Sequence, residues 1–255
     1  MEKEQTLKAS NEDTKGLTSN ALKIIAIIAM TIDHTALILF PRYSLDIPVL
    51  FMHIIGRLTA PIMMFLIVEG YYHTRNIKKY IIRLFIFAII SHFAYAIVFG
   101  KNLIPFKETL FDQTSVIWAF MLGLIGLVIW ESKKLKMWQK QIIIIPIVFA
   151  AFSADWSSPA ALAIIYMGWN RNSFKKQMLW LIFFMVIYSI GYFIFLYKAY
   201  GILQMLIVLA IPLLHQYNGQ RGKWKGMKWF FYIYYPLHLI ILGLIRIFIL
   251  QIGKV

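Results

Sequence analysis

Few ionisable side chains lie inside the long apolar stretches of this chain, and these few are the first candidates for chemistry. Asp33 and His34 are neighbours in one stretch, Arg57 lies in a second and His238 in the last. If the stretches cross a bilayer, each charge near its centre costs at least about 2.5–3.5 kcal/mol, so a retained one is a functional candidate. A histidine can act as a general base near neutral pH, and a neighbouring carboxylate can orient it. Helical rise places these four residues at similar depths, so we predict that they form one mid-membrane set.

A second polar set follows the apolar segment Pro61–Val68. Glu69 and His73 are four residues apart and therefore share one face of a helix. An arginine fork, lysine charges and amide groups in the next turns are the donors that bind phosphate. We predict an anion site at the cytoplasmic face, made of Glu69, His73, Arg75, Asn76, Lys78, Lys79 and Arg83.

Some of these residues also have plainer interpretations. Asp33 and Arg57 can form an interhelical ion pair without any chemical role, and Lys78 and Lys79 can be ordinary topology charges.

The remaining histidines also have structural interpretations. His53 lies near the outer boundary of its segment, which favours an interfacial position, and His92 is typical of a packing histidine. His238 follows Pro236, and a proline inside a membrane helix frees a carbonyl that a neighbouring donor can take.

The composition identifies the class of protein. Of 255 residues, 60% are hydrophobic and the mean hydropathy is +0.70, whereas globular domains are roughly 45–50% apolar. The net charge of +15 comes from basic residues in short loops, which indicates topology signals and contact with the lipid bilayer, not nucleic acid. Cysteine is absent and the histidines lack metal-ligand spacing, so we predict no metal.

The hydropathy pattern predicts an all-α, polytopic helical bundle with about nine transmembrane helices in the cell membrane. Lys and Arg are concentrated in every second loop, so the positive-inside rule places the N-terminus inside and the C-terminus outside. We predict a disordered cytoplasmic tail at 1–19 and a single transmembrane domain at 20–255. The fifth and sixth segments are short and can alternatively form one re-entrant pair. The predicted spans are Asn20–Phe40, Pro48–Tyr72, Lys79–Phe99, Asp112–Trp130, Gln141–Phe152, Trp156–Trp169, Gln177–Tyr197, Gly201–Gln216 and Lys228–Leu250.

Coenzyme A has the shape that both polar sets require. Its phosphates would stay at the cytoplasmic set, and its long, thin pantetheine arm would bring a thioester to His34. A polyprenyl phosphate or a phospholipid headgroup would also fit the cytoplasmic set.

Four stretches of the chain resemble a known family. They are LKIIAIIAMTIDHTA (Leu22–Ala36), GRLTAPIMMFLIVEGYYHTRNIKKYIIRLFIFAIIS (Gly56–Ser91), SADWSSPAALAIIY around Asp155, and FYIYYPLHL (Phe231–Leu239). These stretches resemble the TraX family of conjugation-associated membrane proteins, whose founding member is implicated in N-terminal acetylation of pilin. The chain departs from the family pattern at Ser91-His92 and at Trp156-Ser157-Ser158, which predicts a different acceptor pocket.

The pattern is also distantly similar to the integral membrane acyltransferase-3 superfamily. There a basic residue and a histidine lie eleven positions apart on the first helix, as Lys23 and His34 do here. The resemblance implies that His34 is the catalytic base and that Arg75 and its neighbours bind acyl-CoA.

We therefore predict an acetyl-CoA-dependent N- or O-acetyltransferase of the TraX type. It would move an acetyl or short acyl group from acyl-CoA at the cytoplasmic face to an amine or hydroxyl of a peptide, glycan or lipid acceptor. Asp33 would orient His34, and Arg57 or His238 would polarise the thioester carbonyl. The alternatives are a proton- or anion-coupled transporter with Asp33, His34 and Arg57 as its relay, and a membrane scaffold for a secretion assembly.

Overall fold

The protein is an all-helical bundle in the residues that the computed structural model describes, which are 15–40, 43–104, 107 and 113–249. These residues contain two isolated bridges and no strand. The helices are α2 (Ser19–Leu39), α3 (Ile47–Gly56), α4 (Thr59–His73), α5 (Ile77–Phe99), α6 (Val116–Trp130), α7 (Met137–Ala151), α8 (Ser157–Trp169), α9 (Phe174–Phe195), α10 (Lys198–Gln204), η1 (Met205–Ala210), α11 (Ile211–His215), α12 (Met227–Leu244) and η2 (Ile245–Ile249).

Six spans in the described residues are long and apolar enough to cross a membrane, counting α3–α4, α10–α11 and α12–η2 each as one. Helices α6 and α7 have 15 residues each and α8 has 13, so they extend only about 20–22 Å against a hydrocarbon core of about 30 Å. The multi-pass membrane class is therefore confirmed, whereas only six of nine predicted spans have crossing length. The sidedness of the termini stays a prediction.

The predicted span Pro48–Tyr72 is wrong in one respect, because the structure breaks it into α3 and α4. Pro61 has no N–H to offer the carbonyl of Arg57 four residues earlier, and the regular hydrogen bonding is interrupted there. The break coincides with Gly56, where an added Cβ would lie 2.3 Å from Asp33. The break therefore lies where α3 and α4 come very close to α2.

Smaller boundary differences lie at the chain ends. Residues 1–14 of the predicted tail are outside the described residues, but Leu17 donates to the carbonyl of Gln216 and Ser19 begins α2, so the tail prediction is wrong for these last positions. Asp112 and Leu250, the predicted ends of two spans, also lie outside the described residues.

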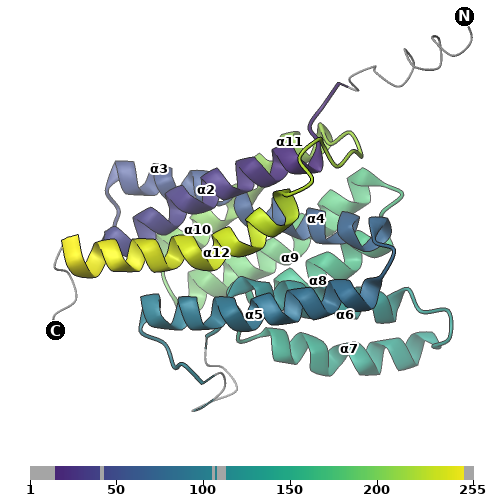
Figure 1. Ribbon diagram of the computed structural model, residues 1–255. Coiled ribbons are helices and arrows are strands. Elements are labelled where there is room, and N and C mark those ends of the chain that lie inside the picture. Colours follow the sequence, from purple (N-terminus) through teal and green to yellow (C-terminus); the bar gives the residue numbers. More distant parts are fainter. Residues whose placement is uncertain (1–14, 41–42, 105–106, 108–112, 250–255) are drawn as a thin grey trace, which may run out of the picture.

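The helices run roughly parallel or antiparallel to one another (Figure 1). The start of α2 and the α4–α5 and α6–α7 connections lie at the right of that view, while the α2–α3 connection and the end of α12 lie at the left. We call the first the basic end, because its connections hold Arg75 and Arg221 and the first turn of α5 holds Lys79, and the second the far end.

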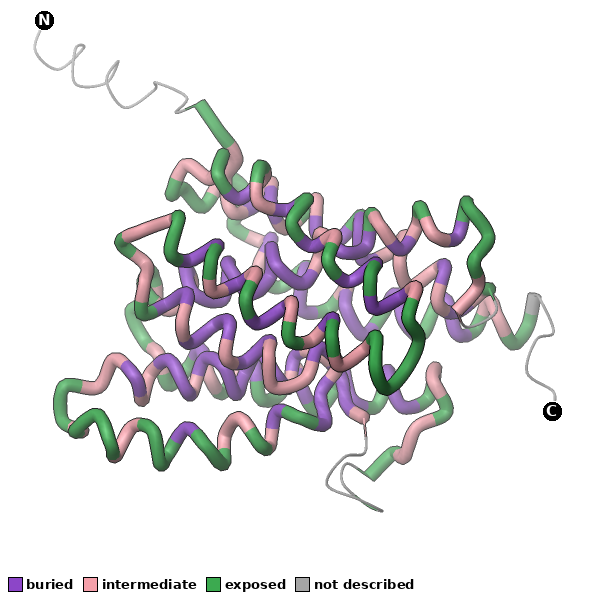
Figure 2. Tube along the Cα trace, turned by 180° about the vertical axis from the view of Figure 1, so that it is seen from behind, coloured by how far each residue is buried: buried purple, intermediate pink, exposed green. Residues whose placement is uncertain are grey.

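Burial follows the position of each helix in the bundle. Helix α4 is buried without interruption from Ala60 to Glu69, which marks it as the centre of the bundle. Exposed and buried turns alternate along the outer helices (Figure 2). Large apolar side chains such as Ile82, Ile145 and Leu179 are more than half exposed, as expected for helices that face lipid.

Candidate functional site

One large cavity runs along the bundle and contacts both predicted polar sets. Its volume is about 1820 Å³, whereas a pocket for one drug-sized ligand is about 300–1,000 Å³. Asp33, His34 and Arg57 line its middle, and residues of the α4–α5 region line its basic end. A ligand held at the basic end can therefore extend to the middle without leaving the cavity.

Arg57 is the hub of the middle of the cavity. Its Nη2 donates to Oδ1 of Asp33 at 2.8 Å, its Nε donates to the carbonyl of His53 at 3.1 Å, and its Nη1 donates to the side chain of Gln204. The guanidinium also lies over the ring of Trp156, 5.3 Å from the centroid. The interhelical Asp33–Arg57 ion pair is confirmed, and it holds α2 against the kink between α3 and α4.

His53 belongs to the same group, so its predicted interfacial position is wrong. The side chain is buried, and its Nδ1 donates to Oδ1 of Asp33 at 2.8 Å. His53 and Arg57 are four residues apart and share one helix face, so both side chains reach the same carboxylate of α2. Asp33 thus accepts from Arg57 and His53, which satisfies its charge.

His34 is oriented by His238 instead of Asp33. Nδ1 of His34 lies 2.6 Å from Nε2 of His238, and Nδ1 of His238 lies 2.9 Å from the carbonyl of Tyr234. A carbonyl only accepts, so His238 is protonated on Nδ1 and, when neutral, accepts at Nε2. His34 is then protonated on Nδ1, and its Nε2 carries the lone pair. The predicted orientation of His34 by Asp33 therefore needs correction, because the carboxylate of Asp33 is bonded elsewhere.

The same geometry separates the two residues predicted to polarise a carbonyl. Both ring nitrogens of His238 are engaged, and His238 is absent from the lining of the cavity. Arg57 lines the cavity and uses three of its five N–H groups on protein partners. Arg57 therefore keeps donors for an oxyanion, and His238 keeps none. The carbonyl that Pro236 frees belongs to Tyr232, whereas His238 bonds to Tyr234, so the structural interpretation of His238 does not account for this contact.

A cluster of cations lines the basic end of the cavity. Arg83 Nε is buried without a hydrogen-bond partner, and the charges of Lys23, Arg221 and Lys228 repel one another. In the described part of the chain, none of the cluster forms an ion pair with a carboxylate. We call these residues the basic cluster: Lys23, Arg75, Lys79, Arg83, Arg221 and Lys228.

The structure sorts the predicted anion-site residues into four groups, of which Glu69 and His73 form the last. Arg75, Lys79 and Arg83 line the cavity within the basic cluster, while Lys78 is exposed and outside the lining. Lys78 is therefore better explained as a topology charge. Asn76 lines the cavity, but its Oδ1 caps α5 by accepting from the backbone N–H of Lys79 at 2.9 Å. Its amide N–H groups remain available to a ligand.

Glu69 and His73 belong to an ion pair on the cavity wall. Nε and Nη2 of Arg171 donate to the two carboxylate oxygens of Glu69 at 3.1 and 3.3 Å, and His73 lies 3.3 Å from Glu69. Arg171 also lies over the ring of Tyr72, 4.6 Å from its centroid. The carboxylate of Glu69 thus serves as a link between α4 and the α8–α9 connection, so a direct contact with a phosphate is unfavourable for it. Arg171 lies in one of the basic loops, which the sequence analysis used only as a topology signal.

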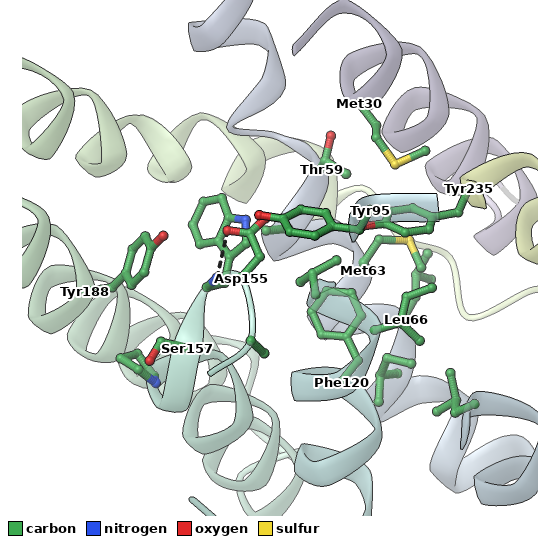
Figure 3. Close-up of a pocket in the computed structure, with 18 of the residues that line it drawn as sticks. Met30, Thr59, Met63, Leu66, Tyr95, Phe120, Asp155, Ser157, Tyr188 and Tyr235 are labelled. Carbon is green, nitrogen blue, oxygen red and sulfur yellow. Dashed lines mark hydrogen bonds between the residues drawn. The ribbon is translucent and has the colours of Figure 1, made fainter. Parts of the chain in front are cut away.

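An apolar neck joins the basic end to the far end. Figure 3 shows Met30, Met63, Leu66 and Phe120 gathered beside Tyr235, all of them on the cavity wall. Past the neck, Asp155 and Tyr188 face the cavity from the α7–α8 connection and α9.

Asp155 is a site candidate that the sequence did not identify as one. Its Oδ1 accepts from the backbone N–H of Trp156 at 3.1 Å. Burial raises the pKa of the Asp155 carboxyl to about 6, because the opposing effect of the Arg57 charge is smaller. The short helices α7 and α8 explain its depth, since their connection is recessed from the far face.

His92 and the grouping of possible metal ligands complete the description of the ionisable side chains. His92 is buried and its Nε2 donates to the carbonyl of Leu103 at 3.2 Å, as a packing histidine would. Within the described residues, no three His, Asp or Glu side chains lie together as metal ligands, and the absence of a metal stays a prediction.

Comparisons with known proteins agree on one family. The family model described as TraX protein matches residues 18–246, which include the middle of the cavity and the basic cluster. A protein of Dichelobacter nodosus named "Probable fimbrial assembly protein FimC, serogroup H1" is 31% identical over 239 residues, which cover 89% of this chain and 95% of that protein. No solved structure matches the chain. The chain is therefore a membrane protein that belongs to the TraX family.

Proposed function

We propose that this protein is a membrane acyltransferase that moves an acetyl or short acyl group from acyl-CoA to an amine. The observation that carries the proposal is the single cavity that joins the basic cluster to His34. The name of the Dichelobacter nodosus relative supports a role in the assembly or modification of fimbriae.

The basic cluster supplies what the phosphates of coenzyme A require. Its cations come from α2, the α4–α5 connection, α5, the α11–α12 connection and α12, so they surround the cavity mouth. A phosphate there would relieve their mutual repulsion and give the buried Arg83 Nε an acceptor. Eleven residues of α2 separate Lys23 from His34, a rise of about 16 Å, and the side chains of the apolar neck would line the pantetheine arm.

The reaction uses the two groups that face the middle of the cavity. The acceptor nitrogen attacks the thioester carbonyl carbon, and Nε2 of His34 takes a proton from that nitrogen as the N–C bond forms. Arg57 donates to the developing oxyanion. The C–S bond then breaks, the thiolate leaves, and the proton held by His34 passes to it to give coenzyme A and the amide.

The orientation of His34 favours an amine over a hydroxyl as acceptor. His34 is supported by a neutral histidine and a carbonyl, whereas a hydroxyl is usually activated by a histidine with a buried carboxylate partner. An amine with a pKa of about 8 needs a weaker base than a hydroxyl does. The same contacts argue against the transporter alternative, because the charge of Asp33 is already satisfied by Arg57 and His53.

Coenzyme A binding by the purified protein tests the proposal. Arg83→Ala should weaken binding about 10- to 100-fold, since a hydrogen bond to a charged group contributes about 1.5–3 kcal/mol. Lys78→Ala is the matched control, because Lys78 lies on the same helix outside the cavity, and it should bind as the unaltered protein does. Absence of binding by the unaltered protein, together with solute flux in proteoliposomes, would refute the acyltransferase in favour of the transporter. Equal losses in both variants would refute the assignment of the basic cluster.

A further inference from the structure

The far end of the cavity is a chamber with aromatic walls. Tyr43 packs against Tyr192, Tyr197 and Tyr200 with centroid distances of 6.4, 5.2 and 5.1 Å. Trp156 stacks on Tyr188 at 5.1 Å. We call this chamber the aromatic vestibule, and the residues of it that line the cavity are Tyr43, Asp155, Trp156, Tyr188, Tyr192 and Tyr200.

Backbone strain in the described chain is concentrated in this vestibule. The non-glycine residues with positive φ are Tyr43 at 60°, Trp156 at 63° and Ser157 at 50°, and all three line the cavity. Such conformations cost about 1–3 kcal/mol each and persist where the surrounding structure imposes them, most often at functional sites. The strained backbone fixes two aromatic rings and the serine beside Asp155, so the vestibule is held in one shape.

The charge of Asp155 has no direct counter-ion. Among the described residues, no Lys or Arg lies within ion-pair distance of its carboxylate, and the charge of Arg57 is matched by Asp33 at 2.8 Å. Lys101 lines the same end of the cavity but forms no such pair. An uncompensated carboxylate between aromatic faces attracts a cation, because ring faces add a cation–π attraction to the ion pair.

We propose that the aromatic vestibule is the acceptor site, that it binds a primary ammonium group with Asp155 as counter-ion, and that acceptors reach it from the membrane face opposite the basic cluster. This inference rests on the proposed acyl transfer. His34, Arg57 and Asp155 line the same cavity, and Arg57 also contacts the ring of Trp156, so the vestibule is continuous with the reacting groups. The bound ammonium loses one proton to water in the vestibule to become the nucleophile, and His34 takes the second proton when the N–C bond forms.

The charge requirement is tested with Asp155→Asn. The probe is a short polar peptide amide with a free N-terminus, and transfer from acetyl-CoA is followed by mass spectrometry. The Michaelis constant for the peptide should rise at least tenfold, while the dissociation constant of coenzyme A stays the same. Asp46→Asn is the matched control, an exposed carboxylate at the far end outside the cavity. An unchanged Michaelis constant in Asp155→Asn, or preferred transfer to a neutral methyl glycoside, would overturn the inference.

The sidedness is tested in proteoliposomes. With acetyl-CoA sealed inside and the peptide outside, acetyl-peptide should form, whereas both reagents outside should give little product. The reverse result would overturn the proposed access route. Coenzyme A binding separates the two proposals: binding that Arg83→Ala weakens, combined with indifference to Asp155→Asn, refutes only the vestibule assignment, whereas no binding refutes the acyltransferase itself.

Discussion

Replacing His238 offers a direct test of how the protein prepares its base. In His238→Ala, Nδ1–H of His34 loses its acceptor at 2.6 Å. An unsatisfied buried donor costs about 1–3 kcal/mol, and each 1.36 kcal/mol is tenfold in rate. Because the lost bond orients the base instead of being the base, we expect kcat/KM to fall about 10- to 100-fold. Coenzyme A binding should not change, since His238 lies outside the cavity lining.

The comparison with His34 makes the assignment specific. His34→Ala removes the base and should reduce kcat about 10²- to 10⁴-fold. If His238 acts only through His34, the double variant is no slower than His34→Ala alone, because the two residues work as one unit. His238→Gln should recover part of the activity, since its side-chain oxygen can accept from Nδ1–H of His34. Initial rates of acetyl transfer to the peptide amide give all four values.

Two results would refute this reasoning. Full activity in His238→Ala would mean that His34 needs no orientation by its neighbour. Strictly additive losses in the double variant would mean that His238 contacts the reactants independently, as the sequence had allowed.

Three further predictions concern the parts around the base. Gly56→Ala should lower the melting temperature and weaken activity, because its Cβ would lie 2.3 Å from Asp33. The control Gly191→Ala, whose Cβ would have nothing within 4 Å, should leave the melting temperature unchanged or raise it. Equal melting temperatures of the two variants would contradict the tight α2–α3 contact. Glu69→Ala should destabilise the protein by about 1–3 kcal/mol by leaving Arg171 without its carboxylate, and Glu69→Gln, which keeps one acceptor, should cost less in denaturant unfolding. The affinity for the peptide amide, measured by calorimetry, should fall as the pH drops through about 6, because Asp155 then becomes neutral. The amine of the peptide, with a pKa of about 8, stays charged over this range. Arg57, Asp33, Tyr188, Tyr192 and Tyr235 also interact electrostatically with Asp155. The same titration in Asp155→Asn therefore isolates the contribution of Asp155, and an unchanged pH dependence in that variant would contradict the role of its charge.

Counting residues along apolar segments predicted the middle of the cavity well. Helical rise alone placed Asp33, His34, Arg57 and His238 at one depth, and the structure brings Asp33 to Arg57 and His34 to His238. Depth does not decide which pairs form, because that depends on rotation of each helix about its axis. The Asp33–Arg57 pair was therefore among the predicted possibilities, whereas the partner predicted for His34 was Asp33 instead of His238.

The largest error of the sequence-based prediction concerns the segment that the structure divides into α3 and α4. Gly56 and Pro61 were visible in the sequence, and a proline that interrupts bonding to Arg57 is a signal for a break. The position of His53 along the segment put it near the outer boundary, whereas its side chain shares a helix face with Arg57 and bonds to Asp33. The vestibule was not predictable in the same way. Tyr188 and Tyr192 share a face of α9, but Tyr43, Asp155 and Trp156 come from connections, which have no periodicity to reveal their neighbours.

Under the proposed acyl transfer, the distribution of charge along the cavity also assigns each substrate to one end. The basic cluster lines one mouth, the Asp33–Arg57 pair cancels in the middle, and Asp155 carries the one unmatched carboxylate of the vestibule in the described structure. A phosphate at the vestibule would meet Asp155, and an ammonium at the other mouth would meet six cations, so both reversed placements are repulsive. In this proposal the donor and the acceptor would meet in the middle, where His34 has its free lone pair and Arg57 its free donors. The neutral Asp33–Arg57 pair would allow both substrates to approach, because a net charge there would repel one of them.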